Sequence, residues 1–124
     1  MKGSTMRLVN LTPHEIVIVG AGDAELLRIP PSGQVARVSV TRVAGNGGFP
    51  MCVTGGAEIP VTVPKYGNVT GLPPSSDVGD IGYIVSALVR QAVGSTRNDL
   101  FSPGELVRDS NGQPIGCRGL EGSV

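Results

Sequence analysis

The chain has 124 residues, of which 40% are apolar but only 3% aromatic, and ten Lys and Arg balance ten Asp and Glu. This length is typical of one domain with a modest core, which must be built from Val, Ile, Leu and Ala. Proteins that coat nucleic acid are usually basic, so zero net charge argues against a long nucleic-acid partner.

Targeting and redox signals point to one compartment. No apolar run approaches the roughly eighteen residues of a membrane span, and no signal-peptide pattern is present. We therefore expect a cytoplasmic protein with no membrane partner, in which Cys52 and Cys117 are free, reduced thiols. Residues 1–5 are expected to be a leader or disordered, residues 6–120 a single domain, and residues 121–124 a frayed tail.

Short β-branched runs separated by Gly and Pro turns predict strands in the first half of the chain. Val38 and Val40 alternate with polar residues, which is typical of a half-exposed strand. A glycine-rich stretch at residues 45–48 predicts a loop. The expected strands are residues 7–11, 16–19, 26–29 and 34–43.

The middle of the chain is less regular. Residues 49–63 predict one or two more strands, and Pro60 and Pro64 favour a place at a sheet edge. Residues 65–74 show no clear pattern. Tyr66 has two interpretations, a ring that stacks on a base or a packing residue at the rim of the fold.

The run from Tyr83 to Ala92 predicts a buried strand that leads directly into a short helix. Ser86 stands at the change and can cap the helix, which we expect over residues 87–93 with Gly94 as its C-cap. Backbone N–H groups at such a junction attract anions. The alternative is an ordinary strand-to-helix turn in a small core.

A hairpin is expected near the C-terminus. Asn111-Gly112 lies between two apolar runs, and both residues tolerate the positive φ of a tight turn. With the segments above this gives six to eight short strands, mostly antiparallel, and one helix. The predicted fold class is α+β, a small single domain dominated by its sheet.

The sequence offers few residues that could form a catalytic site. His14 is the sole histidine and must serve any Ser–His or Cys–His pair, yet it can equally be a turn residue bonded to the backbone. Ser86 lacks the flanking glycines of a nucleophile elbow. The Asp residues show no spacing of a metal site, so we expect no metal, no cofactor and no enzyme activity.

The residue types in the second half of the chain favour anion binding over catalysis. The planar fork of arginine matches phosphate, and Arg97, Arg108 and Arg118 follow the Ser86 corner. Tyr83 or Tyr66 is then the candidate to stack a base. Asp99 and Asp109 each lie within two residues of an arginine, so salt-bridged pairs are the alternative to a ligand site.

Two stretches carry a resemblance to known proteins. The first is Leu-Val-Asn-Leu-Thr-Pro-His-Glu-Ile at residues 8–16, and the second joins Tyr-Ile-Val-Ser at 83–86 with Arg-Asp-Ser-Asn-Gly-Gln-Pro-Ile-Gly-Cys at 108–117. With them the chain resembles a family of small proteins of bacteriophages, prophages and plasmids. More loosely, it is similar to phage anti-defence proteins that sequester nucleotide immune signals, such as the Thoeris anti-defence sponges.

The resemblance implies a non-catalytic homo-oligomer that binds a cyclic ADP-ribose-type or cyclic oligonucleotide messenger between subunits. The expected function is therefore sequestration of a small phosphate-bearing nucleotide in the host cytoplasm. Two alternatives stay open. A phage structural or assembly protein fits the short strands and neutral charge, and a nucleotide-processing enzyme would use His14 or the Asp residues.

Overall fold

The computed structural model describes residues 6–45, 51–77 and 79–123, without the side chains of Met51 and Cys52. The chain divides into two compact units. The sheet unit comprises the described parts of residues 1–37 and 69–124, and the ribbon unit those of 38–68. The leader expected at 1–5, most of the loop expected at 45–48 and the Cys52 thiol lie outside this description.

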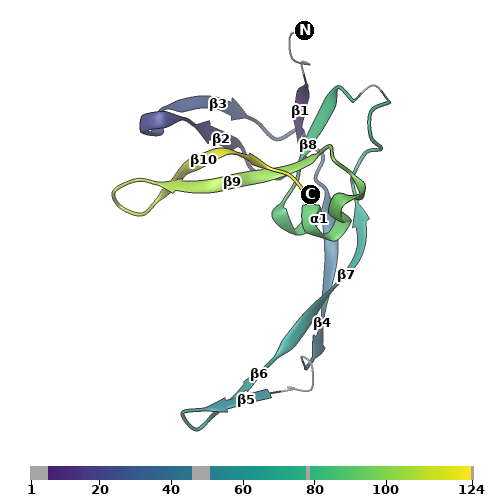
Figure 1. The fold of residues 1–124 in the computed structure, drawn as a ribbon, viewed down its shortest axis with the longest axis vertical. Coiled ribbons are helices and arrows are strands. Elements are labelled where there is room, and N and C mark those ends of the chain that lie inside the picture. Colours follow the sequence, from purple (N-terminus) through teal and green to yellow (C-terminus); the bar gives the residue numbers. More distant parts are fainter. Residues whose placement is uncertain (1–5, 46–50, 78, 124) are drawn as a thin grey trace. The chain divides into compact units, whose positions relative to one another are not determined.

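The sheet unit is built on six strands in the order β1-β8-β9-β10-β2-β3 (Figure 1). Hairpins β9–β10 and β2–β3 are antiparallel, whereas β1–β8, β8–β9 and β10–β2 are parallel neighbours. The strands are β1 (Arg7–Asn10), β2 (Ile16–Val19), β3 (Glu25–Ile29), β8 (Ile81–Ile84), β9 (Leu100–Arg108) and β10 (Pro114–Glu121). A short 3₁₀ turn, η1 (Ala21–Asp23), joins β2 to β3.

The strand-to-helix run at Tyr83 forms the centre of the core. Ile84 and Val85 are fully buried, as is Val89 on the helix α1 (Ala87–Val93), which contacts β9. Ser86 Oγ accepts from the Val89 backbone N–H at 3.2 Å, and Gly94 ends the helix with a φ of 75°. The predicted helix, cap and C-cap are confirmed. A second 3₁₀ turn, η2 (Gly94–Thr96), follows.

Asn10 ties together the two edge strands of the sheet. Its side chain is buried, and its Nδ2 donates to the carbonyl of Ile29 at the end of β3, at 3.0 Å, and to that of His14, at 2.8 Å. Its Oδ1 accepts from the backbone N–H and the hydroxyl of Thr12. All polar atoms of the amide therefore have partners, which buried amides require.

The ribbon unit contains two strand pairs. One joins β4 (Arg37–Ala44) to β7 (Thr62–Thr70), and the other joins β5 (Met51–Thr54) to β6 (Ala57–Pro60) in antiparallel register. The β5–β6 turn is Gly55-Gly56, and both glycines have positive φ, which β-carbon-bearing residues rarely adopt. Val38 and Val40 are half-buried and alternate with exposed neighbours, as predicted. Among the described side chains of this unit, none is buried.

The predicted α+β class with a dominant sheet and one short α-helix is confirmed. The described residues hold ten strands, more than the six to eight expected. The excess includes β7, where Pro64 and Gly67 obscure the strand pattern. Proline is accommodated within a strand where its missing N–H is not needed by the ladder.

Candidate functional site

The structure uses the polar groups near Ser86 for packing. The Ser86 hydroxyl caps α1, a helix of seven residues. Arg90 on the same helix donates through Nε to Ser102 Oγ at 2.8 Å and through Nη1 to the Gly122 carbonyl at 3.2 Å. Its guanidinium also reaches Ser123, so it ties the C-terminal residues to the helix.

Arg97 is occupied by a bidentate ion pair. Its Nε and Nη2 lie 3.0 and 2.8 Å from the two carboxylate oxygens of Asp99, and its Nη1 donates to the Pro73 carbonyl at 2.8 Å. The hydrogen bonds from Arg97 lower the pKa of Asp99, against the opposing effect of burial, and the same pair raises the pKa of Arg97. Tyr83 is 6% exposed, and the Arg97 guanidinium carbon lies 5.9 Å from its ring centre. The Tyr83 ring is therefore enclosed in this chain.

Arg118 is held at a different place. Its Nη1 donates to the Gly20 carbonyl at 2.8 Å, and its Nη2 pairs with the carboxylate of Asp23 in η1. Arg118 lies opposite Glu105 on β9. Glu105 lies six positions after Asp99 on a nearly extended segment, so their backbones are on the order of 20 Å apart. Arg97 and Arg118 therefore do not form one anion site within a chain, contrary to the grouping expected from the sequence.

Arg108 is the last residue of β9, and its side chain is exposed to solvent. Its Nη1 donates to the Gly112 carbonyl at 2.8 Å, and its other nitrogens have no hydrogen-bond partner among the described residues. Asp109 does not pair with it. Instead Asp109 Oδ1 accepts from the backbone N–H groups of Asn111 and Gln113, both at 2.9 Å, which fixes the predicted hairpin turn.

Tyr66, the other candidate for stacking a base, lies on β7 in the ribbon unit and is exposed. His14 is exposed too, and its backbone carbonyl accepts from Asn10 and Thr12. No group of three or more metal-ligating side chains occurs among the described residues.

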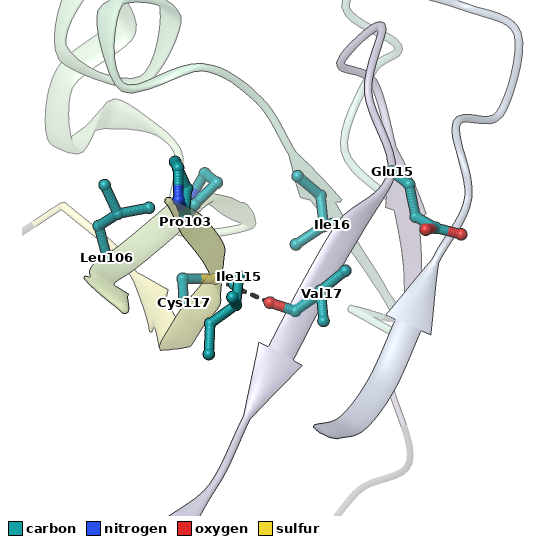
Figure 2. Close-up of a pocket in the computed structure, with 9 residues that line it drawn as sticks. Glu15, Ile16, Val17, Pro103, Leu106, Ile115 and Cys117 are labelled. Carbon is teal, nitrogen blue, oxygen red and sulfur yellow. Dashed lines mark hydrogen bonds between the residues drawn. The ribbon is translucent and has the colours of Figure 1, made fainter. Parts of the chain in front are cut away.

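A cavity of about 270 Å³ lies between β2 and the β9–β10 hairpin. Figure 2 shows Ile16 and Val17 on one side, with the hairpin residues on the other. Here β10 and β2 pair at a single register position, Cys117 with Ile18, and the buried Cys117 thiol donates to the Val17 carbonyl at 3.6 Å. The hairpin side is lined by Pro103, Leu106, Pro114, Ile115, Gly116 and Cys117.

Arg108 does not line this cavity, but it shares a face of β9 with Leu106, which does. Side chains two residues apart on a strand point to the same side, so Arg108 follows Leu106 on that face. Cys117 lies opposite Leu106, whereas its neighbour Arg118 points to the other face of the hairpin. Sequence reasoning found Arg108 but missed the cavity, because no local pattern places β2 beside β10.

A second cavity, of about 220 Å³, adjoins the Arg97–Asp99 pair and is more polar. The carboxylate of Asp99 that faces it is already bound by Arg97. Its lining consists of Met6, Ser75, Ser76, Gly79, Ile81, Asn98 and Asp99.

The fold defines a small α+β protein with a mixed six-stranded sheet. Comparisons of the chain with protein-family models, with curated proteins and with solved structures gave no match. Within the described residues, no helix has both the length and the apolar character needed to cross a membrane.

Proposed function

We propose that the protein is a non-catalytic, phage-type anti-defence protein that binds and sequesters a small phosphate-bearing nucleotide. The ligand class is a cyclic ADP-ribose-type or cyclic oligonucleotide signal, and the protein acts as a homo-oligomer in the host cytoplasm. The observation that carries the proposal is Arg108, an anchored arginine whose other donors have no partner among the described residues, two positions along β9 from Leu106, which lines a cavity of about 270 Å³.

The anchoring of Arg108 favours phosphate binding for two reasons. A guanidinium offers a planar fork of donors that matches two phosphate oxygens. The bond from Nη1 to the Gly112 carbonyl already restricts the side chain, so less conformational entropy is lost when a ligand binds. Arg97 and Arg118, whose charges are paired within one chain, are not part of the phosphate contact that Arg108 provides.

Exposed apolar side chains on the sheet unit support an oligomer. Leu26 and Leu27 are adjacent on β3, which is an edge strand, and Leu26 is 69% exposed. Natural proteins usually protect exposed edges with charges or by covering them. A second copy at this edge would cover both leucines.

Isothermal titration calorimetry with a panel of cyclic nucleotides tests the proposal. We expect micromolar binding or tighter, and a loss of tenfold or more in Arg108→Ala, since a hydrogen bond to a charged group contributes about 1.5–3 kcal/mol. Arg37→Ala, which removes another exposed arginine, is the matched control. Absence of heat change with ligand near 100 μM would contradict the proposal. A ligand recovered intact after the complex is heated separates sequestration from catalysis.

The second candidate is a phage structural or assembly protein. The observation that favours it is the ribbon unit, in which no described side chain is buried and Val53 and Ile59 are exposed. Isolated two-stranded ribbons are marginally stable in water, so such a unit suits contact with other subunits. Light scattering of the ligand-free protein would then show a large ordered assembly.

A further inference from the structure

We propose that the cavity between β2 and the β9–β10 hairpin holds the nitrogen heterocycle of the ligand, while Arg108 on the same strand face binds its phosphate. This inference rests on the proposed function and adds a base subsite to it. Arg108 was foreseen from the sequence as a phosphate ligand, whereas the subsite comes from the packing of β2 against the hairpin.

The walls of the cavity suit a flat ring. Pro103, Leu106 and Ile115 line it on the hairpin side, and Ile16 with the backbone carbonyl of Val17 on the β2 side (Figure 2). Apolar side chains on both sides are a common way to hold a base by stacking. Pockets for complete drug-sized ligands measure roughly 300–1,000 Å³, so a cavity of about 270 Å³ fits a ring system better than a whole cyclic nucleotide. The sugar and phosphate must then lie outside.

The cavity also contains a polar group that a base can use. The Val17 carbonyl accepts from the Cys117 thiol at 3.6 Å (Figure 2). A thiol is a weak donor, so an N–H group on a ring edge can replace it with a stronger hydrogen bond. A hydrocarbon chain has no donor to offer. This contact therefore favours a nitrogen heterocycle as the occupant.

The charges around the cavity suit an anion at one end. Leu106 and Arg108 are two residues apart on β9, about 7 Å, which is a span that a pentose can bridge between base and phosphate. At the other side Glu15 lies on the rim, but its carboxylate is directed away from Ile115 and Cys117 (Figure 2). It is paired with Arg28 at 2.7 Å, so its repulsion of a phosphate is reduced.

Three probes separate the two subsites: adenosine has no phosphate, ribose 5-phosphate has no base, and AMP has both. We expect adenosine and AMP, but not ribose 5-phosphate, to shift the NMR methyl signals of Leu106 and Ile115. Leu106→Ala should weaken AMP binding about tenfold, because about 1.4 kcal/mol of apolar contact is lost, and leave ribose 5-phosphate binding unchanged. Leu88→Ala, the matched control, removes an exposed leucine that does not line the cavity. Arg108→Ala should weaken AMP and ribose 5-phosphate alike.

The other possible outcomes distinguish a wrong base subsite from a wrong proposed function. If nucleotides bind and depend on Arg108, but Leu106→Ala has no effect and the methyl signals do not move, the base subsite is wrong and the proposed function stands. If none of the three probes nor the cyclic nucleotides bind, both are wrong. Methyl signals of Leu106 and Ile115 that change on dilution of the ligand-free protein would show that a side chain of a second copy fills the cavity, and would overturn the subsite.

Discussion

The sheet unit and the ribbon unit are both rich in β-branched residues, yet among the described residues only the first has a core. Every residue found to be buried lies within residues 10–36 or 82–117, in the sheet unit. In the ribbon unit none of the described side chains is buried. Six strands and a helix can enclose side chains between layers, whereas two strands leave both faces open to solvent.

The difference teaches that strand propensity and core formation are separate properties of this chain. The alternation of Val38 and Val40 produces a regular strand without an interior. The run that contains Ile84 produces a shorter strand in which three of the four residues are buried. Substitutions in the sheet unit should therefore change stability strongly, and equivalent substitutions in the ribbon unit weakly.

The largest expected effect comes from the centre of the core. Ile84 is 0% exposed, so Ile84→Ala should lower the free energy of unfolding by about 2–5 kcal/mol through lost transfer energy and an unfilled cavity. Val53 in the ribbon unit is 71% exposed, and Val53→Ala should change stability by no more than about 0.5 kcal/mol. Urea unfolding of both variants measures this contrast. Equal losses would show that the ribbon unit has a buried face in solution.

A smaller effect is expected at the amide that joins β1 to β3. Asn10→Ala leaves the Ile29 carbonyl and the Thr12 N–H without their buried partner, which should cost about 2–3 kcal/mol. Asn68→Ala makes the same change at an exposed position of the ribbon unit and should be close to neutral. Thermal unfolding of the two variants provides the comparison. A neutral Asn10→Ala would contradict the view that this amide joins the edge strands.

The smallest expected effect depends on pH. The bonds from Arg97 hold the pKa of Asp99 below its usual value, so the ionised pair stabilises the fold above the unfolded pKa of about 3.9. That stabilisation is lost as pH falls through the lower folded value. Asp99→Asn should cost about 2 kcal/mol at pH 7, and its difference from the wild type should shrink below about pH 4. Glu58→Gln, at an exposed ribbon position, is the matched control and should be close to neutral at pH 7. A difference for Asp99→Asn that stays constant down to pH 2 would be the contrary result.

Much of the local structure was predictable from the sequence. Ser86 as a cap, Gly94 as a C-cap and the turn at Asn111-Gly112 follow from the preferences of single residues for particular backbone conformations. Most of β7 was not predicted, because Pro64 and Gly67 interrupt its pattern while β4 supplies the pairing partner. Conformational preferences of single residues predicted the local structure wherever the interacting residues were also close in sequence.

The candidate site was only partly predictable. Arg108 could be named from its chemistry, but the sequence could not tell that its neighbour Asp109 bonds to the turn rather than to the arginine. The pairing of Arg97 with Asp99 was foreseen as an alternative, and the pairing of Arg118 with Asp23 was not. Asp23 is 95 residues away from its partner, too far for any local pattern to reveal.

The sequence by itself determined the elements of this protein: the α+β class, the cap, the turns and the alternation of exposed and half-buried side chains. Only the tertiary structure decided which elements meet. It places Cys117 against Val17, 100 residues earlier, and so forms the cavity between β2 and the β9–β10 hairpin. The physical reason is that conformational preferences act within a few residues, whereas the packing of strands is decided by the whole set of side chains that they bury together.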